Sequence, residues 1–186
     1  MGGKRWPWRI HHDRTKCEYA FFVSHVSEDL DDVTAFVQAL DSAFQKAGGL
    51  AVQTCFIDSR DWELAKPVTD EIRQKLLLSQ FFIGWVTPAY LRHSQQRGWV
   101  WIELAYATLI ENSSRAGPEL DSPFILPVFR GVNPEQLSQT PWHDFVPRQV
   151  ERSSPRERLA TYLKRLVPQL LKFHGQQMTK WNRAVR

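Results

Sequence analysis

Residues 19–49, YAFFVSHVSEDLDDVTAFVQALDSAFQKAGG, decide the fold. The first six, Tyr19–Ser24, form a short apolar run without helical period, which predicts a buried strand covered on both faces. An acidic turn begins at Ser27, and Gly48 and Gly49 end the helix that follows. Five apolar residues share one face of this helix: Val33, Phe36, Val37, Leu40 and Phe44. The stretch therefore predicts a strand followed by an amphipathic helix.

The same alternation continues along the rest of the chain. Further strands are expected at three apolar runs, Leu50–Ile57, Phe81–Val86 and Phe124–Phe129. Helices are expected after them, over Pro67–Ser79, Trp99–Ile110 and Pro155–Phe173. Parallel neighbours require crossover connections, so the alternation predicts an α/β fold: an open parallel sheet of four to five strands with helices on both faces.

Three details of this scheme rest on proline. Pro127 indicates an edge position or a bulge for the fourth strand, because proline has no N–H for the ladder. Thr87 and Pro88 are expected to end the third strand and open a polar loop. The proline-rich segment from Gly131 to Pro147 is expected to be irregular, with a short strand or turn at Trp142–Phe145.

Chain length, composition and cysteine count favour a single domain in a reducing compartment. A length of 186 residues with 42% hydrophobic residues suits one buried core. The longest apolar runs are far below the roughly 20 residues that a membrane-spanning helix needs. The N-terminus lacks a secretory signal, and Cys17 and Cys55 are too few for a disulfide framework. We therefore expect a cytoplasmic protein with no membrane contact.

Charge divides the chain into three parts. Residues 1–16 carry five Lys or Arg against one acid, residues 151–186 nine against two, and residues 17–150 ten against seventeen. We expect a domain over 17–150, a basic N-terminal segment before it and a basic C-terminal helix and tail after it. Three alternatives are open for the basic ends: they solubilise the chain, they dock on the acidic core of a neighbouring copy, or they bind anionic lipid or nucleic acid. Nucleic acid is least favoured, because no aromatic-basic recognition motif accompanies the charge.

Ligands of an open parallel sheet bind beyond the carboxyl ends of the strands, where strand order reverses. This edge is expected to carry Ser24 and His25, the segment from Asp58 to Lys66, and Thr87. No Gly-rich phosphate loop follows any strand, and no Cys or His pair has zinc spacing. Neither a conventional dinucleotide cofactor nor a metal is expected.

The segment WVWIE, which ends at Glu103, places an indole and a carboxylate one helical turn apart, on one face. If this face points into the cleft, Trp99 stacks on a planar base or ribose. Glu103, partly desolvated, then interacts with ribose hydroxyls and developing positive charge. In the alternative interpretation, Trp101, Leu104 and Ala105 pack on the sheet and Glu103 is solvated.

A single carboxylate is sufficient to cleave the nicotinamide–ribose bond of NAD. Most glycosidases need a second carboxyl group to protonate the departing oxygen. Nicotinamide in NAD is already a cationic pyridinium and leaves without protonation. The enzyme mainly has to stabilise an oxocarbenium-like ribosyl centre and to exclude or position the acceptor, which one glutamate can do.

Four segments together resemble the TIR domain family over roughly Cys17–Phe145. YAFFVSHVSED is similar to the opening motif, and IDSRDWELAKPVTDEI to the second motif with its mobile loop. FFIGWVTPAYL is similar to the third strand with its Ser/Thr-Pro-x-Tyr-Leu end, and WVWIE matches the Trp-x-x-x-Glu pattern of catalytically active members. Their order and spacing carry the resemblance.

The resemblance implies a flavodoxin-like fold and, for members with this glutamate, hydrolysis or cyclisation of NAD. The products are nicotinamide and linear, cyclic or conjugated ADP-ribose. Bacterial stand-alone members typically act in antiphage defence, so an upstream or downstream defence protein is a possible partner. Members often become active only when copies associate through TIR–TIR contacts and the mobile loop moves aside. The alternative function is a non-catalytic signalling or scaffold module that acts through the same association.

By the same matching, Glu103 is the catalytic residue. NAD is the substrate and no cofactor is required. Six residues are carried over as the substrate-binding set: Ser24, His25, Asp58, Trp62, Lys66 and Trp99. For His25, a structural or capping role is an equal alternative, because a lone histidine has no partner visible in the sequence.

Overall fold

The computed structural model describes residues 10, 12–48, 52–57, 68–95, 98–114 and 123–184. Five strands form the sheet: β1 (Tyr19–Ser24), β2 (Gln53–Ile57), β3 (Ser79–Val86), β4 (Ile125–Arg130) and β5 (Glu151–Ser153). The α-helices are α1 (Leu30–Lys46), α3 (Val68–Leu77), α4 (Pro88–Ser94), α5 (Trp99–Ser114), α6 (Pro134–Leu137) and α7 (Leu159–Ala184). Short 3₁₀ helices complete the described elements: η1 (Arg14–Lys16), η2 (Ser27–Asp29) and η3 (Pro141–Arg148).

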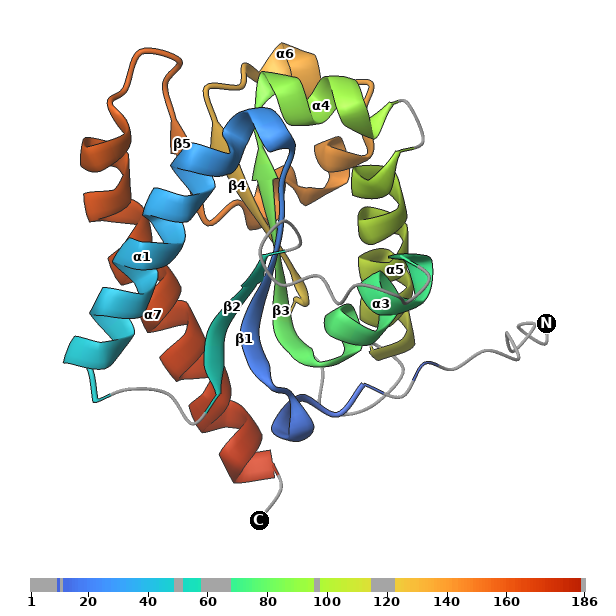
Figure 1. The fold of residues 1–186 in the computed structure, drawn as a ribbon, viewed down its shortest axis with the longest axis vertical. Coiled ribbons are helices and arrows are strands. Elements are labelled where there is room, and N and C mark those ends of the chain that lie inside the picture. The colour runs from blue at the N-terminus through green and yellow to red at the C-terminus, as the bar shows by residue number, and fades with distance from the viewer. Residues whose placement is uncertain are drawn as a thin grey trace.

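All recorded strand pairs are parallel, and the strand order is β2-β1-β3-β4-β5 (Figure 1). This is the flavodoxin-like order, in which the direction of winding reverses between β1 and β3. The predicted fold class is therefore confirmed. β1 lies between β2 and β3, in contact with both along its length.

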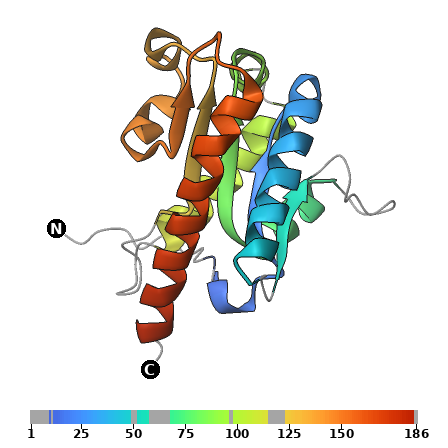
Figure 2. The same ribbon diagram turned by 90° about the vertical axis from the view of Figure 1, so that its left-hand side faces the viewer.

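Helices cover both faces of the sheet, so its central strands are buried on both sides. α1 and α7 lie side by side over one face, and α3, α4 and α5 lie over the other (Figures 1 and 2). Phe21 stacks on Phe81 beneath α1 and α7, whereas Phe22 stacks on Phe82 on the opposite face. Every residue of β1 is buried, which explains why Tyr19–Ser24 shows no alternation of apolar and polar residues.

The predicted polar loop after β3 is wrong, because Thr87 and Pro88 begin the helix α4. Thr87 is the N-cap: its side-chain oxygen accepts a hydrogen bond from the backbone N–H of Tyr90 at 3.1 Å. Pro88 occupies the first turn, where its missing N–H costs nothing. The same two residues that end a strand therefore start a helix.

The prediction of an edge strand or a bulge at Pro127 is also wrong. β4 lies between β3 and β5, and its register with β3 runs without interruption past Pro127. The Pro127 carbonyl accepts a hydrogen bond from the N–H of Val150 at 3.0 Å, so the backbone polar groups of Pro127 face β5. Pairing with β5 begins only at Val128, and the proline therefore removes no bond to β3.

The segment that follows β4 is more regular than predicted. A 3₁₀ helix, η3, stands in place of the short strand or turn at Trp142–Phe145. The fifth strand, β5, follows it. The last helix runs to Ala184 rather than to Phe173, with Pro168 in its interior. Division of the chain at residue 150 stays a prediction.

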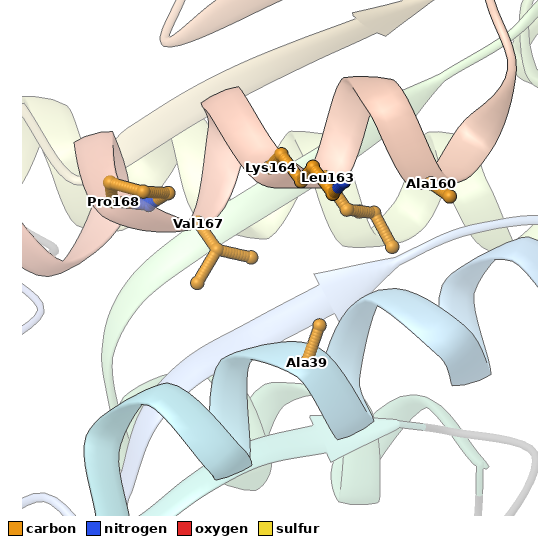
Figure 3. A pocket seen from close by; sticks show the side chains of 6 residues that line it. All are labelled: Ala39, Ala160, Leu163, Lys164, Val167 and Pro168. Atoms are coloured by element: carbon orange, nitrogen blue, oxygen red, sulfur yellow. The ribbon is translucent and has the colours of Figure 1, made fainter. Parts of the chain in front are cut away.

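α7 packs along α1 and leaves a groove between the two helices. Ala39 comes from α1 and the other lining residues come from α7 (Figure 3): Ala160, Leu163, Lys164, Val167 and Pro168. The groove lies on the side of the sheet opposite α5. None of the helices in the described ranges is both long and apolar enough to span a bilayer.

His174 anchors the C-terminal half of α7 in the core. Its ring is buried and contacts the rings of Phe21, Phe44 and Phe81. Its Nε2 lies 3.0 Å from Gln80 Oε1, so a neutral ring with the proton on Nε2 donates this bond. Burial lowers the pKa of His174 from its ordinary value of 6.5. The folded protein therefore holds this histidine neutral.

We expect the free energy of unfolding to fall as the pH drops below about 6.5, because the unfolded chain takes up a proton at His174 that the folded chain resists. Replacement His174→Phe should make this loss smaller between pH 7 and pH 5, because the variant has no group to protonate at this position. Urea unfolding at the two pH values measures the difference. His143→Gln, at a histidine that is 64% exposed, is the control for loss of a histidine outside the core. Equal pH dependence in the native protein and His174→Phe would contradict the assignment.

Candidate functional site

The candidate site lies where the strand order reverses. β1 ends at Ser24, which pairs with Gly84 near the end of β3. Thr87 follows β3 directly. The carboxyl ends of these two parallel strands therefore open onto the same edge, which is where ligands of such sheets bind.

Glu103 projects from α5 onto this edge and is buried. Its side chain is 1% exposed, and the Ser24 hydroxyl donates a hydrogen bond to Oε2 at 2.5 Å. Hydrogen bonds to a carboxylate are characteristically short, and a buried carboxylate requires them. The alternative of a solvated Glu103 is therefore wrong. Trp101, which that interpretation placed on the sheet, is 43% exposed.

Tyr90 extends this hydrogen bond into a chain of three residues. Its hydroxyl lies 2.8 Å from the Ser24 Oγ, and its side chain is fully buried. Burial and the nearby charge of Glu103 raise the pKa of Tyr90 well above its ordinary value. Tyr90 is thus a neutral phenol that acts as a donor. Tyr90 belongs to the strand-end motif FFIGWVTPAYL, but that motif alone assigns it no role.

Two contacts hold α4, and with it Tyr90, against the start of α1. The Thr87 hydroxyl donates to Asp29 Oδ2 at 2.6 Å, and His93 Nε2 lies 3.0 Å from Glu28 Oε1. Burial raises the pKa of Asp29, and the bond from Thr87 opposes that shift. The helix that carries Tyr90 is therefore tied to the turn that follows β1.

Trp142 fills the space beneath Tyr90 and fixes the identity of residue 84. The two rings meet edge to face, with centroids 5.6 Å apart and planes at 69°. A Cβ atom at Gly84 would lie 2.1 Å from Trp142 Cη2, so only glycine allows the indole to lie on the strand. In the sequence, the signal for this close approach of the Trp142 indole to the backbone is Gly84, a glycine inside a strand.

Of the residues carried over from the family motifs, the structure brings Ser24 and Glu103 together. His25 follows Ser24 and is 5% exposed, with its Nδ1 3.4 Å from the Val23 carbonyl oxygen. Trp99 is the first residue of α5, one turn before Glu103, and is 51% exposed.

The other three residues carried over from the family lie outside the described residues: Asp58, Trp62 and Lys66. Their roles stay predictions. Within the described ranges, no group of three or more His, Cys, Asp or Glu could hold a metal ion. Among the described residues, this edge offers a fully buried carboxylate, Glu103, which can stabilise a cationic centre in a substrate.

Comparison with known proteins identifies the family of this chain. The model of a family described as TIR domain matches residues 21–160. No curated protein matches the chain. Among solved structures, the chain is similar to the TIR domains of the activated Roq1 resistosome directly recognizing the pathogen effector XopQ. Identity is 19% over 83% of this chain and 82% of that chain, with a TM-score of 0.43.

We expect Gly84→Ala to lower the free energy of unfolding by about 3 kcal/mol, because the added methyl group displaces Trp142 from a filled core. Chemical denaturation measures the change. Gly175→Ala is the matched control: nothing lies within 4 Å of its added Cβ, and the substitution lies inside α7. It should stabilise the protein by up to about 1 kcal/mol. Equal stability of Gly84→Ala and the native protein would refute the packing argument.

Proposed function

This chain belongs to the TIR domain family, and from that premise we propose that it cleaves the nicotinamide–ribose bond of NAD, with Glu103 as the catalytic carboxylate. The observation that carries the proposal is the burial of Glu103 at the reversal point of the strand order, where Ser24 hydrogen-bonds it. A glutamate whose only role was to keep the surface soluble would be exposed to solvent, whereas Glu103 is buried.

In the proposed reaction, the bond between the ribosyl carbon and the pyridinium nitrogen breaks. Nicotinamide keeps the bonding electron pair and leaves as a neutral molecule. An acceptor oxygen or nitrogen then attacks the ribosyl carbon and releases its proton to solvent or to Glu103. Water as acceptor gives ADP-ribose; an internal or foreign acceptor gives a cyclic or conjugated product.

Burial makes the carboxylate effective in this step. Positive charge develops on the ribosyl centre as nicotinamide departs, and an anion that is shielded from water interacts with that charge more strongly than a solvated one. The Ser24 hydroxyl holds Oε2 in place, so little reorganisation is needed at the moment of bond cleavage.

The half-exposed Trp99 is the proposed stacking surface for a planar group of NAD. It precedes Glu103 by one helical turn, and an aromatic ring at this position offers a face to a base or to nicotinamide. Substrate contacts from His25 and from Asp58, Trp62 and Lys66 complete the proposal. These contacts come from the family motifs.

Activity is proposed to require association of copies through TIR–TIR contacts. A role in bacterial antiphage defence and a cytoplasmic location stay predictions from the sequence. The competing function, a signalling or scaffold module without turnover, shares the fold and the association. Release of nicotinamide from NAD by the purified protein separates the two functions.

Purified protein given NAD, with and without crowding agents that promote assembly, should release nicotinamide, and Glu103→Gln should lower kcat by about 10²–10³-fold. The amide keeps the size of the side chain but not its charge. Chromatography with mass spectrometry measures nicotinamide and identifies the ribosyl product. Undiminished release by Glu103→Gln would exclude the catalytic role, and no release by the native protein in any state would favour the scaffold.

Glu111→Gln is the matched control for this variant. Glu111 is a second buried carboxylate on α5, and its Oε2 accepts hydrogen bonds from the backbone N–H groups of Phe124 and Ile125. The control should lower the melting temperature and leave turnover per folded molecule unchanged. A loss of turnover in the control that equals the loss in Glu103→Gln would mean that helix position, not charge, is responsible.

Trp99→Ala should raise KM for NAD about 10-fold, because stacking of a base on an aromatic side chain contributes roughly 1–3 kcal/mol. The unfolding free energy should change by less than about 0.5 kcal/mol, since the indole is half exposed. Trp101→Ala, a comparably exposed indole on the same helix, should leave KM unchanged. Steady-state kinetics and thermal melts check both. Equal KM values for the two variants would exclude stacking at Trp99.

A further inference from the structure

We propose that Tyr90 is a positioning residue for Glu103, acting through the hydroxyl group of Ser24. The inference rests on the proposed function and adds to it a residue that does not touch the substrate. Tyr90 is on α4, Ser24 ends β1 and Glu103 is on α5, so the chain of hydroxyls joins three elements at the edge of the sheet.

The direction of the hydrogen bonds follows from the chemistry of the three groups. An ionised carboxylate only accepts, so the single hydroxyl hydrogen of Ser24 points at Glu103 Oε2. The contact between Ser24 and Tyr90 must then use the Tyr90 hydrogen, with Ser24 Oγ as acceptor. Tyr90 thereby prevents the Ser24 hydroxyl from rotating away from the carboxylate.

Packing alone does not explain the hydroxyl group of Tyr90. The ring is fully buried against Trp142, and phenylalanine would fill the same space. A buried hydroxyl costs free energy unless it is hydrogen-bonded, and the partner recorded here is the serine that contacts the catalytic carboxylate. The hydrogen bond from the Tyr90 hydroxyl to Ser24 therefore explains why residue 90 is tyrosine and not phenylalanine.

The surroundings keep this oxygen in place. Thr87 caps α4 and is bonded to Asp29, so the helix that carries Tyr90 cannot shift without breaking that contact. Other titratable groups described at this edge are His25, which follows Ser24, Asp29 itself, and the pair formed by Glu28 and His93. All of them are kept unchanged in the experiment.

The test compares Tyr90→Phe with the native protein in NAD cleavage across pH. We expect kcat to fall about 10-fold through loss of alignment, with KM within about twofold of the native value. The variant removes a donor from the chain that stabilises the charged form of Glu103, so the pKa of this carboxyl should rise. The acid limb of the kcat profile should therefore move to higher pH, which a purely structural defect would not produce.

A double-mutant cycle tests whether Tyr90 acts through Ser24. Ser24→Ala should lower kcat more than Tyr90→Phe, and the double variant should be no slower than Ser24→Ala alone. Ser24→Thr, which keeps the hydroxyl, should restore most of the activity that Ser24→Ala loses. Additive losses in the double variant would overturn the inference.

Tyr162→Phe is the matched control. Tyr162 is also a fully buried tyrosine, but it lies on the opposite face of the sheet, and its hydroxyl donates to the backbone carbonyls of Phe129 and Glu151. It should change neither kcat nor the pH profile. A shift of the acid limb in this control as large as that in Tyr90→Phe would overturn the inference.

Titration of the Glu103 side-chain carboxyl by carbon-detected NMR separates this inference from the proposed function. If the native protein turns over NAD and Tyr90→Phe retains both its kcat and its profile, the inference fails and the function stands. If the native protein is inactive in every state, the function fails. The NMR midpoint still decides the hydrogen-bond chain: a higher midpoint in Tyr90→Phe supports it, and an unchanged midpoint overturns it.

Discussion

The hydrogen bond from Ser24 to Glu103 is the interaction on which the architecture of the candidate site depends. A carboxylate removed from water is costly unless donors replace the lost hydration. The surrounding features can be understood as means of keeping that donor in place: Tyr90 behind Ser24, Trp142 beneath Tyr90, and a glycine where Trp142 meets the strand. The identity of residue 84, on strand β3, is thus linked through four successive contacts to the carboxylate on α5.

The two buried carboxylates of α5 have different partners and therefore different roles. Glu111 accepts the N–H groups at the start of β4 and pairs with Arg148, which ties the far end of the helix to the sheet. Glu103 contacts a serine at the carboxyl end of the central strands.

Features that are local in sequence could be predicted, and contacts between distant segments could not. The strand at Tyr19–Ser24, the helix after it and the proximity of Ser24 to Glu103 follow from periodicity, the rule for strand ends and the family motifs. The role of Tyr90 depends on a partner 66 residues away, which no local pattern reveals. The expectation for Pro127 is wrong because its backbone faces β5, and whether proline costs a ladder bond there depends on where pairing with β5 begins, which the local sequence does not reveal.

The position of α7 in the chain has a consequence for biosynthesis. One face of the sheet, including Phe81 and Trp85, is covered by residues of α7 such as Tyr162 and Leu166. These residues leave the ribosome after all five strands have been made. A nascent chain therefore presents an apolar sheet face that α1 covers only in part until α7 emerges, and in this interval chaperones or aggregation compete for it.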